Sequence, residues 1–177
     1  MRFMATPIGG VFMVEPERFA DERGFFARTW ESGEFTTAGL NGALAHASIS
    51  FNLRAGTLRG MHYQRAPFEE AKLVRCTQGA MFDVALDLRP ASPTYRRWHA
   101  VELTADSRRM LYIPEGCAHG FQTLTDNTEV LYLITAPYSP AHGAGVRWND
   151  PAFGIEWPPA TQRIMAPRDA AYPDFSS

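Results

Sequence analysis

The stretch that decides the fold is Ala80-Met81-Phe82-Asp83-Val84-Ala85-Leu86-Asp87-Leu88. Large apolar side chains occupy every second position: Phe82, Val84, Leu86 and Leu88. The positions between them, on the opposite face, are Met81, Asp83, Ala85 and Asp87. This two-residue period is that of a β-strand and not the 3.6-residue period of a helix. A second apolar run, 71–77, precedes it, and the intervening Gln78-Gly79 predicts a β-hairpin.

Short runs of this kind recur along the chain, with turn residues roughly every eight to twelve positions. The other predicted strands are 3–8, 11–16, 25–30, 44–53, 58–64, 98–103, 109–113, 120–124 and 129–136. A turn is predicted at 21–24 and one helix at 32–40, which Ser32 caps and Gly39 ends. Many short strands at this spacing are typical of a β-sandwich or barrel. With no repeat and no linker, we expect a single domain, 1–177.

Composition narrows the class of protein. A chain of 177 residues with 45% hydrophobic residues and a net charge of −2 is typical of a soluble globular domain. The chain has no run of basic residues, so nucleic-acid binding is not expected. No apolar stretch reaches the length of a membrane span, and residues 1–4 lack a signal-peptide core. We therefore expect a cytoplasmic protein with no membrane partner and, with only Cys76 and Cys117, no disulfide framework.

Two stretches each place one histidine beside a glycine turn: Leu58-Arg59-Gly60-Met61-His62-Tyr63-Gln64 and Pro114-Glu115-Gly116-Cys117-Ala118-His119-Gly120-Phe121. Between them lies Lys72, the only lysine beside 16 arginines (17 − 1). If a concave β-structure points these side chains inward, one cavity contains a base (His62), a cation (Lys72) and a further polar group that can hold a ligand (His119). A metal site is not expected, because Gln64 breaks the His-x-His pair that β-barrel metal sites often use.

Proton transfer is the chemistry that these residues suit. Histidine is a natural general base near neutral pH, and Asp169 and Asp83 are both candidates to orient His62. A desolvated Lys72 can stabilise an enolate, and Tyr132 is a candidate acid for the opposite face. The alternative is that the histidines are hydrogen-bonded core residues, Lys72 ends in solvent and Tyr132 packs. A thiol nucleophile at Cys117, beside His119, is a further alternative that no flanking signature supports.

At these residues the sequence strongly resembles the dTDP-4-dehydrorhamnose 3,5-epimerase family. The matching stretches cover nearly the whole chain: 21–26, 56–64, 72–74, 79–89 with 92–94, 113–121 and 148–158. The resemblance implies an all-β, cupin-type jelly-roll barrel with short peripheral helices, usually a homodimer. It also implies epimerisation of a nucleotide-linked 4-keto-6-deoxyhexose at carbons next to the keto group, with no metal and no cofactor.

The resemblance further implies roles for individual residues. His62 matches the family's base, Asp169 its acidic partner and Tyr132 its acid. The positions that match those holding diphosphate or sugar are Arg23, Arg59, Lys72 and His119. The aromatic positions near the nucleotide base are matched by Phe26 and Tyr138, and Arg168 stands where the family has lysine.

Physical reasoning agrees with the anion-binding roles. Arginine forks suit diphosphate oxygens, and an Arg59 buried between Leu58 and Gly60 needs a partner of that kind. The alternative for Arg23 and Arg59 is an internal salt bridge. The candidate acids for such a bridge are Asp21, Glu22, Asp83 and Asp87.

The chain also departs from the family pattern. Two positions near the thymine, where the family commonly has glutamate, are Arg28 and Gly143, and a Gln-x-Asn pair is replaced around His46 and Ser48. The chemistry is therefore better supported than the nucleotide, and Arg28 is kept as a candidate substrate contact. Open alternatives are a 3-epimerase, an epimerase of another nucleotide hexose, a non-catalytic sugar-nucleotide-binding protein and a metallo-cupin oxygenase.

Overall fold

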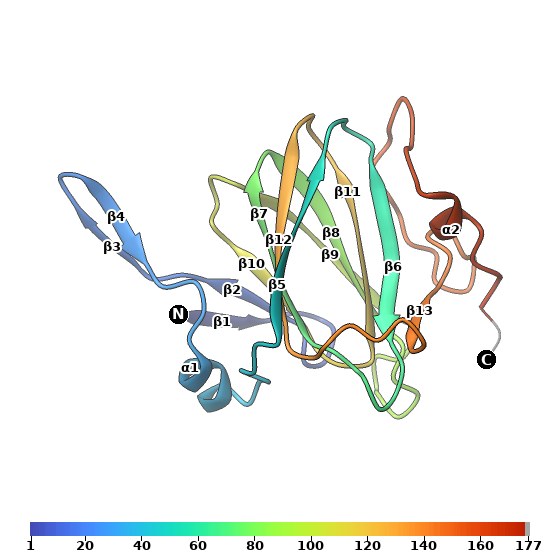
Figure 1. Ribbon diagram of the computed structural model, residues 1–177, viewed down its shortest axis with the longest axis horizontal. Coiled ribbons are helices and arrows are strands. Elements are labelled where there is room, and N and C mark those ends of the chain that lie inside the picture. The colour runs from blue at the N-terminus through green and yellow to red at the C-terminus, as the bar shows by residue number, and fades with distance from the viewer. Residues whose placement is uncertain (176–177) are drawn as a thin grey trace.

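Two antiparallel sheets pack face to face in the computed structural model, which describes Met1–Phe175 (Figure 1). The six-stranded sheet runs β1 (Arg2–Ala5), β2 (Phe12–Glu15), β10 (Met110–Ile113), β7 (Lys72–Gln78), β12 (Thr128–Ile134) and β5 (His46–Asn52). The five-stranded sheet runs β13 (Gly143–Gly145), β6 (Leu58–Gln64), β11 (Cys117–Thr123), β8 (Ala80–Asp87) and β9 (Trp98–Thr104). The short helices are α1 (Ser32–Thr37) and α2 (Pro167–Ala170). The predicted all-β jelly roll with short peripheral helices is confirmed.

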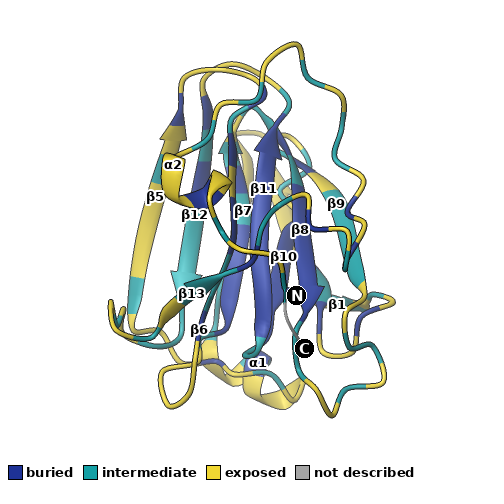
Figure 2. Ribbon diagram, turned by 90° about the vertical axis from the view of Figure 1, so that its right-hand side faces the viewer, coloured by how far each residue is buried: buried dark blue, intermediate teal, exposed yellow. Residues whose placement is uncertain are grey.

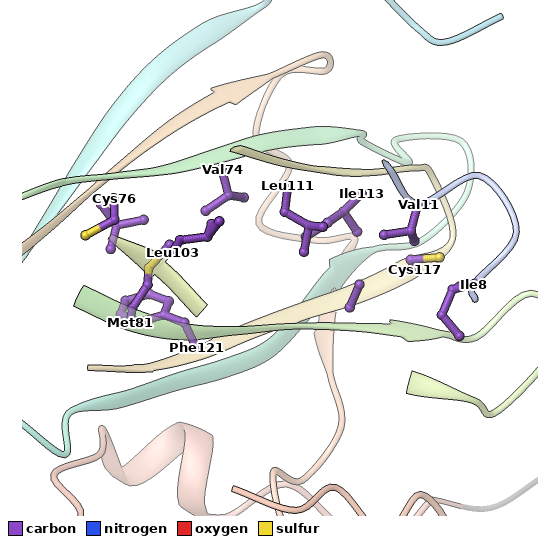
Figure 3. Close-up of a cluster of buried hydrophobic side chains, with 12 residues drawn as sticks. Ile8, Val11, Val74, Cys76, Met81, Leu103, Leu111, Ile113, Cys117 and Phe121 are labelled. Atoms are coloured by element: carbon purple, nitrogen blue, oxygen red, sulfur yellow. The ribbon is translucent and has the colours of Figure 1, made fainter. Parts of the chain in front are cut away.

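The alternation along β8 places side chains in two different cores. Met81 points between the sheets and packs with residues such as Leu111 and Phe121 (Figure 3), and Ala85 belongs to the same cluster. Val84 and Leu86 point outward and pack under the C-terminal segment around Phe153. Each large side chain buried in this way contributes about 1.5–3 kcal/mol. Both faces of the five-stranded sheet are therefore fixed, which gives a rigid wall for a site between the sheets.

The hairpin prediction at Gln78-Gly79 is wrong. Strand β7 pairs with β10 and β12, whereas β8 pairs with β11 and β9, so this turn carries the chain from one sheet to the other. Gly79 has a φ of +78°, and a Cβ there would lie 2.6 Å from the Oγ1 atoms of Thr125 and Thr128. Glycine is therefore required at position 79, but in a turn between the two sheets and not in a hairpin. A two-residue turn signal in the sequence does not distinguish these two cases.

Two other local predictions need correction. The cap of α1 is not Ser32 but Glu31, whose carboxylate accepts hydrogen bonds from the backbone N–H groups of Gly33 and Glu34. The helix ends at Thr37, earlier than the predicted 32–40, and Gly39, with a φ of +75°, lies in the turn that follows it. The strand predicted at 25–30 stops at Ala27, because it belongs to a short hairpin of β3 (Arg18–Asp21) and β4 (Gly24–Ala27).

This β3–β4 hairpin projects away from both sheets, at the upper left of Figure 1. It exposes three phenylalanines, Phe19, Phe25 and Phe26. Strand β5, at the free edge of the six-stranded sheet, is largely exposed in Figure 2 and carries Ile49 and Phe51 on its outer side. Within Met1–Phe175, the helices are all too short or too polar to span a bilayer.

Candidate active site

A cavity of about 400 Å³ opens between the two sheets. The five-stranded sheet supplies four of its lining residues, Arg59, His62, His119 and Phe121. The six-stranded sheet supplies Ser48, Ser50, Lys72, Tyr132 and Ile134, and the remaining residues are Glu70, Ala166, Arg168 and Asp169. The cavity therefore gathers every catalytic candidate from the sequence, from elements that lie far apart along the chain.

His62 is paired with Asp169. The imidazole Nε2 lies 2.8 Å from Asp169 Oδ1, and Gly60 N–H donates to Asp169 Oδ2 at 3.3 Å. Burial alone would raise the pKa of Asp169, but the hydrogen bonds from His62 and Gly60 outweigh it and lower that pKa below its usual value. An ionised Asp169 accepts a hydrogen bond from the Nε2–H group of His62, which favours the tautomer with Nδ1 as the basic nitrogen. The alternative partner for His62, Asp83, bonds elsewhere.

Lys72 does not end in solvent. Its side chain is only 8% exposed, its Nζ lies 3.0 Å from Glu70 Oε1, and it donates to the carbonyl oxygen of His62 at 3.2 Å. An ammonium has three N–H donors, so donor capacity remains for a substrate oxygen. Glu70 was missed by sequence reasoning. It lies in a loop, and no spacing rule places a loop carboxylate against a strand lysine.

His119 and Asp83 form a second histidine–aspartate pair, with Nε2 2.6 Å from Oδ1 and both side chains buried. The Tyr132 ring meets His119 edge-on, with centroids 5.9 Å apart. Burial, and then the nearby charge of Asp83, raises the pKa of Tyr132 far above its usual value. The Tyr132 phenol therefore keeps its proton and is available as a donor.

His62 and Tyr132 stand on opposite walls of the cavity. His62 lies on β6 and is directly paired with His119 on β11, both in the five-stranded sheet. Tyr132 lies on β12 and Lys72 on the adjacent β7, both in the six-stranded sheet. A flat ring held between the sheets presents one face to His62 and the other to Tyr132.

Two of the arginine candidates, Arg59 and Arg168, lie at the cavity, and the prediction for Arg59 needs one correction. Arg59 is exposed rather than buried, because its side chain points into the open cavity. Its Nε donates to Asn52 Oδ1 at 2.8 Å, and within the described residues it has no acidic partner, so the salt-bridge alternative is wrong for Arg59. Arg168 has a side chain 70% exposed, with its Nε 3.7 Å from Asp169 Oδ1.

A second cavity, of about 260 Å³, adjoins the first and shares His62, Glu70 and Arg168 with it. It is lined by Tyr138 and Gly143, both noted in the sequence, and by Tyr63 and Tyr172, which the sequence did not single out. From β5, the first cavity receives Ser48 and Ser50 and not His46, so of the two residues noted at the altered pair only Ser48 lines it.

Three substrate-binding candidates do not reach either cavity of their own chain. Arg23 and Phe26 lie on the β3–β4 hairpin and Arg28 just after it, all exposed. Arg23 pairs with Asp21, Nη2 to Oδ2 at 2.5 Å, which is the alternative considered for Arg23. One chain thus brings together only part of the predicted set.

The metal and thiol alternatives find little support. Gln64 is engaged by loops: its Nε2 donates to the carbonyls of Phe68 and Pro137, and its Oε1 accepts from Ser139 N–H. Within Met1–Phe175 no three His, Cys, Asp or Glu side chains form a group that could hold a metal. Burial raises the pKa of Cys117 to about 12, which keeps the thiol protonated and a poor nucleophile.

Fold and site define a jelly-roll protein with an acid–base pocket. Residues 5–177 match the family model described as dTDP-4-dehydrorhamnose 3,5-epimerase. The chain is 41% identical to the Sinorhizobium fredii dTDP-4-dehydrorhamnose 3,5-epimerase, over 99% of this chain and 90% of the relative. It is also 41% identical to the Streptomyces niveus dTDP-4-dehydrorhamnose 3-epimerase, over 96% of this chain and 81% of the relative.

A solved structure agrees. The Bacillus anthracis dTDP-4-dehydrorhamnose 3,5-epimerase, solved with TDP and PPi bound, superposes with a TM-score of 0.93 at 37% identity, covering 98% of this chain and 99% of that one. The chain belongs to the dTDP-4-dehydrorhamnose 3,5-epimerase family and so to the isomerases. The family, fold and enzyme class predicted from the motifs are confirmed.

Proposed function

We propose that this protein epimerises a dTDP-linked 4-keto-6-deoxyhexose, of the dTDP-4-dehydro-6-deoxyglucose type, with His62 as base and Tyr132 as acid. The observation that carries the proposal is the placement of the His62–Asp169 pair and of Tyr132 on opposite walls of one cavity. Inversion of a carbon centre needs a proton to leave one face and return to the other, and this cavity has a group for each step.

The steps follow from the contacts. His62 Nδ1 removes the proton from the carbon next to the keto group, and the C–H electron pair forms the enolate C=C bond as the carbonyl pair moves to oxygen. A free N–H of Lys72 stabilises that oxygen, while Glu70 and the His62 carbonyl fix the ammonium. Tyr132 then delivers its proton to the other face as the carbonyl re-forms. Solvent reprotonates the phenolate, and His62 releases its proton.

The diphosphate has cationic partners at the cavity mouth. Arg59 and Arg168 present exposed guanidinium groups there, and a guanidinium binds phosphate oxygens in pairs. His119, held by Asp83, is left to contact the sugar. Tyr138, 63% exposed beside the second cavity, offers a ring on which a nucleobase can stack. The TDP and PPi bound to the similar Bacillus anthracis enzyme support a nucleotide diphosphate as the ligand.

Whether one carbon or two are inverted is the main remaining alternative. The chain is equally identical, at 41%, to a relative named 3,5-epimerase and to one named 3-epimerase. Overall identity therefore does not separate the two outcomes. We keep the 3,5-epimerase as the proposal and the 3-epimerase as the alternative, because His62 and Tyr132 serve both.

We also propose that two copies form the working enzyme. Phe19, Phe25 and Phe26 on the projecting hairpin are exposed, as are Ile49 and Phe51 on the outer side of β5. Large apolar side chains exposed on a projecting hairpin and on a free sheet edge are typical of surfaces that a partner covers. A second copy packed there would cover them and could carry Arg23, Phe26 and Arg28 to the cavity of its partner.

Subunit mixing tests the shared site. His62→Asn and Arg23→Ala dimers are each expected to be poorly active, and mixed dimers regain one site free of both changes. Random exchange of equal amounts should restore ~25% of wild-type sites if Arg23 acts on the partner's cavity. No recovery, although mass spectrometry shows that mixed dimers form, would mean that Arg23 does not act on the partner's cavity. Elution as a monomer would refute the dimer itself.

The function itself is tested by product analysis. The protein is incubated with dTDP-4-keto-6-deoxyglucose, and the sugars are identified by NMR. The 4-keto product inverted at both carbons supports the proposal, and inversion at C3 alone supports the 3-epimerase. Binding without turnover would favour a non-catalytic sugar-nucleotide-binding protein. A cytoplasmic location, proposed with this activity, agrees with two free, buried thiols.

A further inference from the structure

We propose that Tyr172 is a positioning residue that holds the His62–Asp169 pair in place by filling a slot left open by Gly145. This inference rests on the proposed function of His62 as the base. It adds two residues, neither of which is part of the acid–base set described above.

Gly145 lies directly opposite His62 where β13 pairs with β6. Side chains of directly opposed residues stand on the same face of a sheet, roughly 5 Å apart. Because Gly145 has no side chain, the sheet is open beside the imidazole at this point. A Cβ on Gly145 would lie only 2.3 Å from Cζ of Tyr172 and 2.6 Å from its hydroxyl oxygen. The Tyr172 ring therefore occupies the space that a side chain at position 145 would take.

The imidazole is held between two side chains of one short segment. Asp169 on α2 bonds Nε2 at 2.8 Å, and Tyr172, three residues later, meets the imidazole edge-on with centroids 6.2 Å apart. A single hydrogen bond to Asp169 leaves the imidazole free to tilt about that bond. The Tyr172 ring limits that motion and keeps Nδ1 aimed at the substrate carbon, where a displacement of 1 Å can cost about 100-fold in rate.

The residues that follow Tyr172 are also held in place. Phe175 N–H donates to Asp150 Oδ2 at 2.6 Å, and the Phe175 ring packs against Phe153 with centroids 5.0 Å apart. Arg147 and Asp174 form an ion pair in the same region. Tyr172 thus lies between two anchored points, α2 and this contact with the 147–153 loop. The backbone that carries the Tyr172 ring is therefore held on both sides.

A double-mutant cycle tests the slot. Gly145→Ala should displace the Tyr172 ring and lower kcat about 10- to 100-fold, with dTDP affinity changed less than about threefold. Tyr172→Ala should lower kcat similarly. Adding Gly145→Ala to Tyr172→Ala should cost nothing more, because the ring that clashed is gone. Tyr172→Phe keeps the ring and should recover most of the lost kcat. Gly9→Ala is the matched control, since its nearest neighbour atom would be 3.8 Å away.

A second readout separates this inference from the proposed function. In the substrate-free protein, the His62 N–H proton is followed by ¹⁵N-edited NMR, and its exchange with solvent should be about tenfold faster in Gly145→Ala. This signal reports the pair even if the wild type turns over no sugar. The inference would be overturned if Gly145→Ala lowered kcat by the same factor in the wild type and in the Tyr172→Ala variant. So would weaker dTDP binding with unchanged kcat, which would make Tyr172 a ligand contact.

Discussion

His62 Nε2 and Asp169 Oδ1 lie 2.8 Å apart although the two residues are 107 positions apart in the chain. Asp169 is almost fully buried and its pKa is lowered by this contact, so it remains a carboxylate throughout the neutral range. Asp169→Asn keeps the size of the side chain but cannot favour the same imidazole tautomer or charge. We expect kcat to fall at least about 100-fold while dTDP affinity, measured by calorimetry, stays within threefold. An Asn variant with wild-type kcat would remove Asp169 from the mechanism.

Tyr132 should separate proton removal from completed epimerisation. Tyr132→Phe retains the ring in its buried position but has no proton to return, so His62 can still form the enolate. In D2O the variant should exchange substrate protons with retention of configuration, or release elimination products, while epimer formation falls. Product NMR reads both outcomes. A normal epimer yield would mean that Tyr132 serves packing only.

Metal removal should have no effect. The side-chain amide of Gln64 is hydrogen-bonded to the carbonyls and an N–H of neighbouring loops, and the proposed acid–base steps need no Lewis acid. Activity should therefore survive prolonged EDTA treatment and dialysis, with no stoichiometric metal by elemental analysis. If activity were lost and one added metal ion restored it, the metallo-cupin alternative would be favoured.

The nucleotide base is expected to be held with little discrimination. Gly143 has no side chain, and Arg28 offers only donors, so neither can accept the imide N–H of thymine as a glutamate can. Arg28 can instead donate to a carbonyl of cytosine, guanine or thymine, or contact the diphosphate. Stacking alone should let dTDP, UDP, CDP and GDP bind within about 1 kcal/mol of one another, whereas a placed hydrogen bond would give one of them a preference of about 1–3 kcal/mol. A dTDP preference of a hundredfold or more would show a placed contact that these residues do not provide.

Asp87 should govern acid stability away from the cavity. Its burial would raise its pKa, but hydrogen bonds from Arg89, Ser92 and Thr94 prevail and lower it. Since the folded-state pKa lies below the unfolded one, this contribution is complete above the unfolded value of about 3.9 and is lost as pH falls below it. Asp87→Asn should cost about 3 kcal/mol of unfolding free energy at pH 7.

Urea unfolding at several pH values measures this effect. The difference between wild type and Asp87→Asn should shrink as the pH drops below about 4, because the wild type then loses the same charge. Exposed Asp106→Asn serves as the control and should leave the urea midpoint unchanged at every pH. A difference that stays constant down to pH 2 would mean that packing, and not the charge, explains the loss.

The sequence predicted strands well and their partners poorly. The two-residue period from Met81 to Leu88 identified β8, because side-chain alternation is a local property. The partition between sheets escaped prediction, because Gly79 makes the same left-handed turn at a corner as in a hairpin. The helix cap was also mispredicted. The side chain of either Glu31 or Ser32 can reach the first N–H groups of α1, and the path of the chain before the helix determines which one does.

The candidate site shows the same division. His62, Lys72 and Tyr132 were found from residue type and strand position, and the structure brings them to one cavity. The choice of Asp169 over Asp83 came from the family resemblance, since no local pattern links α2 to β6. Glu70 and Tyr172 carried no signal, because their importance arises from contacts across loops. The substrate roles of Arg23, Phe26 and Arg28 stay predictions that depend on a second copy.

The central claim is that His62 removes a proton from the carbon next to the keto group. The most direct measurement is deuterium incorporation at C3 and C5 of dTDP-4-keto-6-deoxyglucose in D2O, followed by NMR for wild type and His62→Asn at saturating substrate. The account predicts incorporation by the wild type at the carbons that it inverts, and rates lower by ~10²–10⁴ in the variant with dTDP affinity retained. Incorporation by His62→Asn at the wild-type rate would contradict it.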